Sequence, residues 1–384
     1  MKGRIGKISP QFLKQAYRLI RYRNEWKKFV REIGIRKKQD KLLADRYNPE
    51  VKKLVVFVVG GGDWETGKDT ISGGIISIVS LCEETAAISD RHGAATIMCT
   101  MNEGHLLLKH EMFENKTAVF RFSQLPAYFR SVREIIIHIP EFLVTIFFEG
   151  LTKKDKAWLG AIEGLHINVM NQNIRLMPGP TVIEEIKSIS PKVTITTAHQ
   201  KYCTPEFRDT FGVPIHKFSV WISPEQYRFK TWEEKENLII VSPDQHPMKE
   251  EILSHLSEVP GLDVQIIRNL TYEQYKELIS RAKWSLTFGE GLDGYLIEPV
   301  FSGAIGFAVY NEQFFTPDFK DLETIYSSFE QMKENILADM KRLDKKEKFA
   351  AYQKKEFDLC AAHYSKDQYR KNIVAFYENR YTYA

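Results

Sequence analysis

The stretch Phe288–Glu298 reads FGEGLDGYLIE and ends an apolar run, Trp284–Phe288, that has the composition of a buried strand. It carries two glutamates, Glu290 and Glu298, with seven residues between them. In an α/β sheet, ligands bind beyond the carboxyl ends of the strands, so Glu290 is expected at a ligand-binding position. Glu298 lies about two helical turns further on and can point the same way. Carboxylates placed like this accept paired hydrogen bonds from hydroxyl groups.

Strands and helices alternate on both sides of this stretch. The N-terminal series has predicted strands at residues 54–59, 95–99, 134–139, 165–170 and 193–197. The C-terminal series has predicted strands at residues 238–241, 264–267, 284–288 and 304–309, with helices at residues 249–256 and 272–281. Each series predicts a parallel sheet with helices on both faces. Residues 215–232 carry prolines and no clean periodicity, so we expect the domain boundary there.

The length of 384 residues also favours two domains, because single hydrophobic cores stop growing at roughly 250–300 residues. We expect a basic helical arm over residues 1–50, a Rossmann-like domain over residues 51–222 and a second one over residues 223–364. After about residue 320 the chain is predicted to be largely helical. Ser365 and Gln368 form a capping-box pattern for a last helix, residues 365–384, which we expect to pack back on the N-terminal domain.

Cysteine usage and hydropathy indicate a cytoplasmic protein. The four cysteines are scattered and show neither a C-x-x-C pair nor zinc-ligand spacing. Residues 1–40 are basic and lack the apolar core of a signal peptide. The most apolar stretch, residues 135–148, is interrupted by polar residues and proline and is too short to span a bilayer.

Charge is distributed very unevenly. Residues 1–53 hold 17 Lys and Arg against 5 Asp and Glu, which gives +12, while residues 54–384 hold 37 against 45, which gives −8. Ser9 and Pro10 predict a helix start, apolar residues recur at helical spacing up to Ile33, and Gly34 is expected to end the helix. Residues 1–46 are therefore expected either to lie on an anionic membrane surface or to dock on the body with a solvated charged face. No nucleic-acid-reading motif follows.

Several of these segments together resemble the family-four retaining glycosyltransferases, whose signature is this glutamate pair with a Gly-rich start. Residues 71–74 with residues 91–93 resemble the family's Gly-Gly loop and Gly-His step, residues 214–222 its interdomain linker, and residues 241–249 its phosphate loop. The resemblance covers about residues 54–315. It implies the GT-B architecture, in which two Rossmann-like domains face each other across a cleft.

The resemblance also implies an activity and a set of site residues. The expected reaction moves a hexose-type sugar, with retention, from a nucleotide-sugar donor to a cell-surface glycan or lipid-linked acceptor. No cofactor is expected, and the lack of a D-x-D motif fits metal-independent chemistry. Glu290 would hold the sugar, Glu298 the ribose and Lys249 the diphosphate. The full donor set is Gly73, Gly74, Lys249, Arg268, Glu290, Gly291, Leu292, Asp293 and Glu298.

Three positions depart from the family's pattern. Pro243 stands where the phosphate loop usually has an arginine, and Asn171 stands near the place of a histidine that often lines the sugar pocket. Pro299 follows the second glutamate, which predicts a helix beginning there, with Glu298 in its first turn. The acceptor-side candidates are His138, Asn171 and His199. The departures leave two alternatives open, namely a degenerate GT-B subunit that supports a partner transferase, and another GT-B enzyme such as a sugar-nucleotide epimerase.

Overall fold

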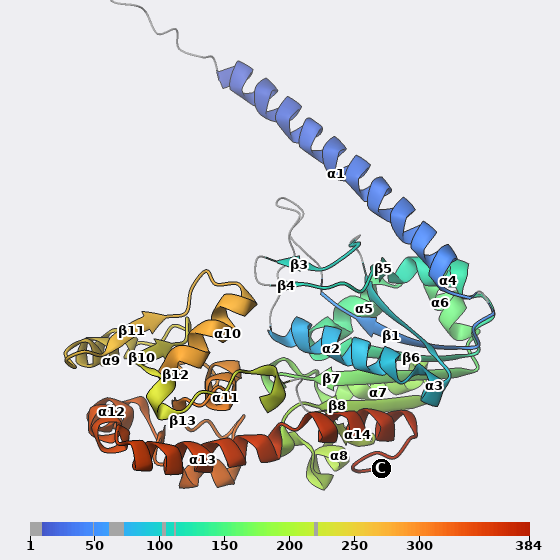
Figure 1. The fold of residues 1–384 in the computed structure, drawn as a ribbon. Coiled ribbons are helices and arrows are strands. Elements are labelled where there is room, and N and C mark those ends of the chain that lie inside the picture. The colour runs from blue at the N-terminus through green and yellow to red at the C-terminus, as the bar shows by residue number, and fades with distance from the viewer. Residues whose placement is uncertain (1–9, 49, 61–72, 102–104, 111–112, 219–221) are drawn as a thin grey trace, which may run out of the picture.

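The computed structural model describes residues 10–48, 50–60, 73–101, 105–110, 113–218 and 222–384, with backbone alone for residues 10–20, 24, 109–110 and 113–114. These residues form two α/β domains, each built on a parallel sheet, and a long helix that projects from the first domain (Figure 1). The expected fold class is therefore confirmed.

The sheet of the first domain has seven strands in the order β5-β2-β1-β6-β7-β8-β9, and every neighbouring pair is parallel. Its strands are β1 Lys53–Val58, β2 Ala95–Thr100, β5 Val119–Arg121, β6 Glu134–Pro140, β7 Gly164–Asn171, β8 Lys192–Thr197 and β9 Ile215–Lys217. A separate antiparallel pair joins β3 Lys109–His110 to β4 Phe113–Glu114. The order reverses between β1 and β6, which places a crevice beyond their carboxyl ends.

The sheet of the second domain has five parallel strands in the order β11-β10-β12-β13-β14. Its strands are β10 Glu236–Val241, β11 Asp263–Ile266, β12 Ala282–Leu286, β13 Ile305–Val309 and β14 Ile325–Tyr326. Here the order reverses between β10 and β12. The loops that follow these two strands, residues 242–248 and 287–293, therefore flank the second crevice.

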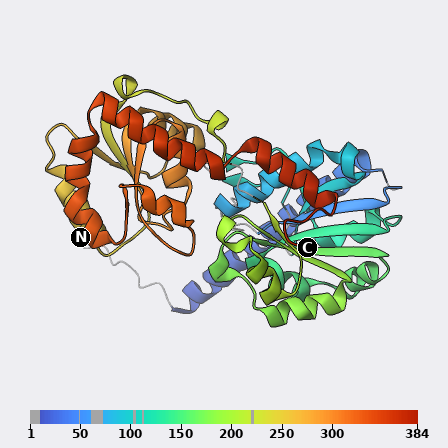
Figure 2. The ribbon, with the colours of Figure 1, turned by 90° about the horizontal axis from the view of Figure 1, so that it is seen from below.

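Helices cover both faces of the two sheets (Figures 1 and 2). They are α1 Pro10–Arg46, α2 Gly73–Ala87, α3 Ser89–His92, α4 Leu125–Tyr128, α5 Val144–Gly150, α6 Lys153–Gly160, α7 Pro180–Ile189, α8 Pro205–Phe211, α9 Lys249–Ser257, α10 Tyr272–Arg281, α11 Gly294–Phe301, α12 Phe329–Leu343, α13 Lys346–His363 and α14 Lys366–Tyr377.

Strand β1 shows why the sequence gives this layered fold. Its residues from Leu54 to Val58 are fully buried, although successive side chains point to opposite faces of the sheet. Val55 and Phe57 pack in one core with α2 and α14, whereas Leu54, Val56 and Val58 pack in another with α5, α6 and α7. A strand covered on both faces reads as a continuous apolar run, which is the pattern that the sequence shows.

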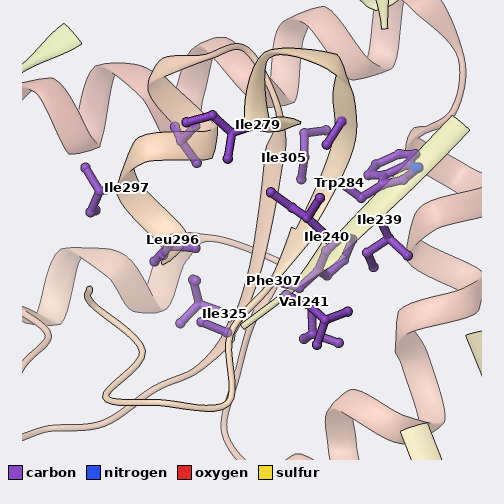
Figure 3. Close-up of a cluster of buried hydrophobic side chains, with 14 of the residues drawn as sticks. Ile239, Ile240, Val241, Ile279, Trp284, Leu296, Ile297, Ile305, Phe307 and Ile325 are labelled. Carbon is purple, nitrogen blue, oxygen red and sulfur yellow. The ribbon is translucent and has the colours of Figure 1, made fainter. Parts of the chain in front are cut away.

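The core of the second domain surrounds β10, β12 and β13 (Figure 3). Trp284 packs edge-on against Phe349 of α13, and its ring is 6.0 Å from that of Phe307 on β13. Figure 3 shows Leu296 and Ile297 of α11 beside this sheet. This packing fixes α11, and with it the loop that carries Glu290, relative to the strand ends.

Helix α1 does not end at Gly34, as the sequence predicted, but continues to Arg46. A glycine inside a helix costs only about 1 kcal/mol relative to alanine, and contacts beyond Gly34 offset this cost. Leu43 is 1% exposed, and Gln39 donates its side-chain amide to the carbonyl of Val119 at 2.6 Å. The last turns of α1 are thus part of the first domain.

The end of the chain also belongs to the first domain in space. Figure 2 shows α13 and α14 running from the second domain to the first. Ser365 caps α14 by accepting from the amide of Gln368, which is one half of the predicted capping box, and the side-chain amide of Gln368 donates to Asn372. Tyr377 of α14 donates or accepts a hydrogen bond with His138 of β6 at 3.0 Å. Beyond the helix, Tyr383 exchanges two backbone hydrogen bonds with Ile215 of β9.

Within the described ranges, no helix combines the length and the apolar character needed to cross a bilayer.

Candidate functional site between the domains

The two domains touch through the loop that follows β7. Asn173 donates its side-chain amide to an Oε1 oxygen of Glu290 at 3.1 Å. Arg175 donates Nε to the side-chain oxygen of Gln313 at 2.7 Å, and its guanidinium lies 5.4 Å from the ring centre of Phe314. Glu290 and Gln313 belong to loops after β12 and β13, so these contacts join the strand ends of both sheets.

Glu141 holds the β7 loop in position. This glutamate lies at the carboxyl end of β6 and is only 4% exposed. Its two oxygens accept from the backbone amides of Gln172 at 3.2 Å and Asn173 at 2.9 Å. Burial raises the pKa of Glu141, and the two backbone donors offset only part of this shift. Gln172 in turn donates to the carbonyl of Gly74, which links the loop to the start of α2.

Glu290 is half-buried at the second crevice, beside the switch point between β10 and β12. The pKa of its carboxyl is raised, mainly by burial. The charge of Arg175 offsets part of this shift, and the charge of Asp244 adds to it. Gly291, directly after it, has φ +89°, and a Cβ there would lie 2.4 Å from the ring of Phe315. Only glycine fits this turn, so Gly291 sets the direction in which Glu290 points.

Asp293 caps helix α11. Its Oδ1 accepts from the amides of Tyr295 at 2.9 Å and Leu296 at 3.2 Å, and its Oδ2 accepts from the hydroxyl of Thr287 at 3.1 Å. Burial, together with the nearby charge of Asp244, raises the pKa of Asp293 to about 7 against the hydrogen bonds that it accepts. The first free amides of α11 are therefore already engaged by a side chain. Leu292, also in the predicted donor set, is 6% exposed and packs in the core.

Glu298 lies inside α11 rather than in a first turn after Pro299, so the predicted helix start is wrong. The cap by Asp293 explains the difference, because it starts the helix at Gly294, four residues before Glu298. Burial raises the pKa of Glu298 to about 8, against hydrogen bonds from Tyr275 and Tyr227 that lower it. Its Oε2 oxygen is buried and has no hydrogen-bond partner among the residues that the structure describes.

Lys249 opens helix α9, as predicted, but its charge is used within the loop that follows β10. The side chain is 2% exposed, and Nζ donates to the carbonyls of Ser242 and Asp244, both at 2.7 Å. Nζ also lies 5.4 Å from the ring centre of Phe288. Burial lowers the pKa of Lys249, and so does the charge of Arg268, which is exposed after β11. Lys249 thus ties the loop after β10 to helix α9.

Replacing Lys249 by methionine is expected to weaken nucleoside diphosphate binding by about tenfold or more, because the loop after β10 loses its anchor. Stability should also fall, by about 1–3 kcal/mol, since two carbonyls lose their donor. Calorimetry and thermal denaturation measure the two effects. Lys283→Met is the matched control, because Lys283 is also buried, at 6% exposure, but pairs with Asp344 away from the crevice. Equal nucleotide affinity in both variants would contradict a role for Lys249 in the site.

Two of the acceptor-side candidates, His138 and Asn171, are buried. His138 is fully buried, stacks on Phe57 at 4.5 Å between ring centres and accepts or donates hydrogen bonds with Tyr377 and Asn168. Burial lowers its pKa to about 3, so it is a neutral core residue. Asn171 is 1% exposed and donates to the hydroxyl of Thr197 at a distance of 3.5 Å. Asn171 ends β7 and lines a small cavity beyond that strand end, together with Gln172 and Thr197.

The third candidate, His199, does lie where the domains meet. Its Nε2 shares a hydrogen bond with the carbonyl of Gln172, and its ring packs edge-on against Phe314 of the second domain at 5.3 Å. Burial lowers its pKa to about 4. Gln172 also contacts the start of α2. This helix begins at Gly73, as predicted, and the carbonyl of Gly74 accepts the hydrogen bond from the Gln172 side chain.

Sequence reasoning missed Glu141, Asn173 and Arg175. One signal was present, since Asn173 follows a predicted strand just as Glu290 does, and the carboxyl ends of parallel strands gather at one edge of a sheet. No group of three or more His, Cys, Asp or Glu side chains in the described part of the chain is arranged to hold a metal ion.

Comparison with solved structures identifies the arrangement of the two domains. The chain is similar to sucrose-phosphate synthase from Thermosynechococcus elongatus, with a TM-score of 0.54 and 10% identity over 85% of this chain and 99% of that chain. The chain has the GT-B fold. In GT-B terms, β1–β9 form the first Rossmann-like domain and β10–β14 the second, and Glu290 lies between them.

Two further GT-B structures are similar at lower scores. HepE from Anabaena, solved with UDP and glucose, has a TM-score of 0.48 and 10% identity over 85% of this chain and 99% of that chain. Trehalose-6-phosphate synthase OtsA has a TM-score of 0.46 and 8% identity over the same shares of the two chains. No protein-family model and no curated protein matches the sequence.

Proposed function

We propose that the chain is a glycosyltransferase that moves a hexose-type sugar from a nucleotide-sugar donor to a hydroxyl of its acceptor. The observation that carries this proposal is the hydrogen bond from Asn173 to Glu290, which joins the two GT-B domains beside the switch point of the second sheet. A carboxylate at this place can accept hydrogen bonds from sugar hydroxyls, and an amide opposite it can donate to them.

The proposed reaction retains the configuration at the anomeric carbon. The bond from that carbon to the phosphate oxygen breaks, and the acceptor hydroxyl bonds to the same face. The hydroxyl proton passes to the departing phosphate oxygen, so no protein nucleophile is needed. Negative charge grows on the leaving diphosphate, and the guanidinium of Arg175, whose charge already acts on Glu290, can stabilise it together with backbone amides near Gly291.

We propose a cell-surface glycan or a lipid-linked glycan as the acceptor, within polysaccharide biosynthesis. Such an acceptor would place the protein in the cytoplasm, at the inner face of the cell membrane. We further propose that transfer needs neither a cofactor nor a metal ion, because Arg175 and the loop amides would offset the charge of the diphosphate.

A degenerate GT-B subunit is the second candidate, and one arrangement favours it. Around the expected diphosphate position the loops present Asp244 and Asp293, whose oxygens would both lie within 3 Å of a Cβ at Gly289, at 2.9 and 2.8 Å. The one lysine of the phosphate loop, Lys249, is engaged by backbone carbonyls. Carboxylates near a diphosphate oppose its binding unless protons or cations compensate.

A panel of nucleoside diphosphates and nucleotide sugars separates these candidates. A transferase should bind at least one member of the panel, which raises the melting temperature, and should release the nucleoside diphosphate faster when a glycan acceptor is added. Isothermal calorimetry and a coupled assay for the released nucleotide measure the two effects. Binding of no nucleotide at all would support the degenerate subunit, and product formed without acceptor would support an epimerase or hydrolase.

A further inference from the structure

Helix α1 presents two different faces along its length. The first face packs on the N-terminal domain: Glu32 pairs with Arg121, Gln39 donates to the carbonyls of His105 and Val119, and Leu43 is buried. The helical residues of this face, Glu32, Gln39 and Leu43, follow the spacing i, i+7 and i+11 that one helix face requires. This face explains how the helix is anchored.

The second face is apolar and uncovered. We call it the apolar stripe, and it consists of Tyr22, Trp26, Phe29, Val30 and Ile33. Their exposed fractions run from 73% at Tyr22 to 40% at Ile33. These five side chains are half of the ten large exposed apolar side chains in the described part of the protein, and they fall within twelve residues. Single exposed apolar residues are ordinary, but a contiguous row of them marks a binding surface.

The apolar stripe is not a continuation of the anchored face. Ile33 follows Glu32 directly, and successive residues of a helix point about 100° apart. The stripe extends for about 17 Å along the part of α1 that projects away from both domains (Figure 1). No rotation of the helix about its axis can bury both faces on the first domain, so the stripe is available to another partner.

The charges around the stripe indicate what that partner is. Residues 21–38 hold eight Lys and Arg and only two acidic residues. Both acids are engaged, because Glu25 pairs with Arg21 at 3.1 Å and Glu32 pairs with Arg121 of the body. Seven of the eight basic side chains are exposed and the eighth, Lys28, is half-buried. A partner must therefore accept apolar and aromatic side chains and also carry negative charge.

We propose that the apolar stripe and the basic side chains beside it dock α1 on an anionic lipid surface. Tyr and Trp favour the boundary between headgroups and acyl chains, and lysine and arginine bind anionic headgroups. This inference deepens the proposed function, because it brings the site to a membrane that would hold a lipid-linked acceptor. It needs no donor, so it can be tested separately from sugar transfer.

A second copy of the chain is a less suitable occupant. A coiled-coil seam through Tyr22, Trp26, Phe29 and Ile33 would continue with Arg36 and Asp40, which places charges in the seam. Two parallel copies would also bring their strongly basic helices together, and like charges at that distance repel. An anionic surface removes this repulsion instead of creating it.

The test is co-sedimentation of the full chain with vesicles of phosphatidylcholine, alone or mixed with phosphatidylglycerol, at physiological ionic strength. Substitutions are preferable to removing residues 1–46, because that deletion would also remove the buried contacts of Gln39 and Leu43. The paired variant Trp26→Glu/Phe29→Glu removes the centre of the stripe. Lys27→Glu/Lys28→Glu removes charge beside it and leaves the stripe intact. Ile189→Glu is the matched control, because Ile189 is 50% exposed on α7 of the same domain.

The wild type and the control are expected to bind the anionic vesicles, and each paired variant should bind at least about tenfold more weakly. Binding should weaken as salt is raised. The proposal is overturned if the wild type binds neither vesicle, or if both paired variants bind like the control. It is also overturned if the wild type binds no lipid but forms a concentration-dependent dimer, and Trp26→Glu/Phe29→Glu abolishes that dimer. A chain that binds no nucleotide in the panel could still bind anionic vesicles, so failure of the proposed function would not change the result of this test.

Discussion

Glu290→Gln is expected to lower the rate of sugar transfer by about a hundredfold or more, while nucleoside diphosphate affinity stays within about twofold of the wild type. Glu290 is placed where the sugar, and not the nucleotide, is proposed to lie. Its hydrogen bonds to the sugar would strengthen as the ring distorts toward the oxocarbenium-like transition state. Glutamine keeps the shape but has one acceptor oxygen instead of two and carries no charge.

Calorimetry with the nucleoside diphosphate and a transfer assay at saturating donor measure these two quantities. Glu250→Gln is the control, because Glu250 is an exposed glutamate of the same domain. The assay is run with and without a chelator, since the proposed mechanism needs no metal. Near-normal transfer by Glu290→Gln would show that the glutamate pair has been misinterpreted. Activity lost on chelation would contradict the proposed metal independence.

Most strands could be predicted from the sequence because parallel strands are buried on both faces. Leu54–Val58 is a continuous apolar run for this reason, and Glu134–Ile139 is apolar apart from Glu134 and His138; the structure confirms both as β1 and β6. The strands that were missed, among them β5, β9 and β14, are two or three residues long, which is too short to show any period. Strand β9 lies in the segment that was read as a linker, where Pro214 and the short run hid it.

The candidate site could be predicted only in the part that is local in sequence. Glu290 follows a recognisable strand, and the turn through Gly291 needs glycine. The partners of that loop come from far away, since Asn173 lies 117 residues from Glu290 and Arg175 lies 138 residues from Gln313. Such pairings depend on how two domains pack, which no sequence period records. Sequence reasoning therefore selected Asn171 as a site candidate, whereas Asn173, two residues further on, makes the contact with Glu290.

Local rules also failed where a tertiary contact outweighed them. Gly34 was expected to end α1, but the anchoring of Gln39 and Leu43 carries the helix past it. The position of Lys249 at a helix start suggested a purpose other than helix stability, and the structure supplies one in its two carbonyl acceptors. In both cases the outcome depends on tertiary contacts that the local sequence does not show.

Glu298→Gln is expected to weaken binding of the nucleoside diphosphate and of the nucleotide sugar alike, by about tenfold. Both ligands contain the ribose that Glu298 is proposed to hold, so the loss should be the same for both. This pattern differs from that of Glu290→Gln, which should spare the free nucleotide. Calorimetry with the two ligands, on each variant, distinguishes the two roles.

Stability should change in the opposite direction, with a defined dependence on pH. Burial raises the pKa of Glu298 from 4.5 to about 8, so the folded protein holds a proton that the unfolded chain releases. Between these values the folded state binds more protons, and stability falls as pH rises, by up to roughly 1.4 kcal/mol per pH unit for one such group. Glutamine has no proton to lose. The melting temperature of Glu298→Gln should therefore rise relative to the wild type from about pH 5 to about pH 8 and then level off.

Glu356→Gln is the matched control for both effects. Glu356 of α13 is fully buried, accepts from the amide of Gly306 at 3.0 Å, and its pKa is likewise raised by burial to about 8. It should therefore gain stability over the same pH window without any change in nucleotide affinity, because it lies in the core against β13. If Glu298→Gln also left nucleotide affinity unchanged, Glu298 would be a second buried core carboxyl with no ribose to hold. If neither variant gained stability toward pH 8, both carboxyls would be ionised at neutral pH and paired more strongly than their neighbours indicate.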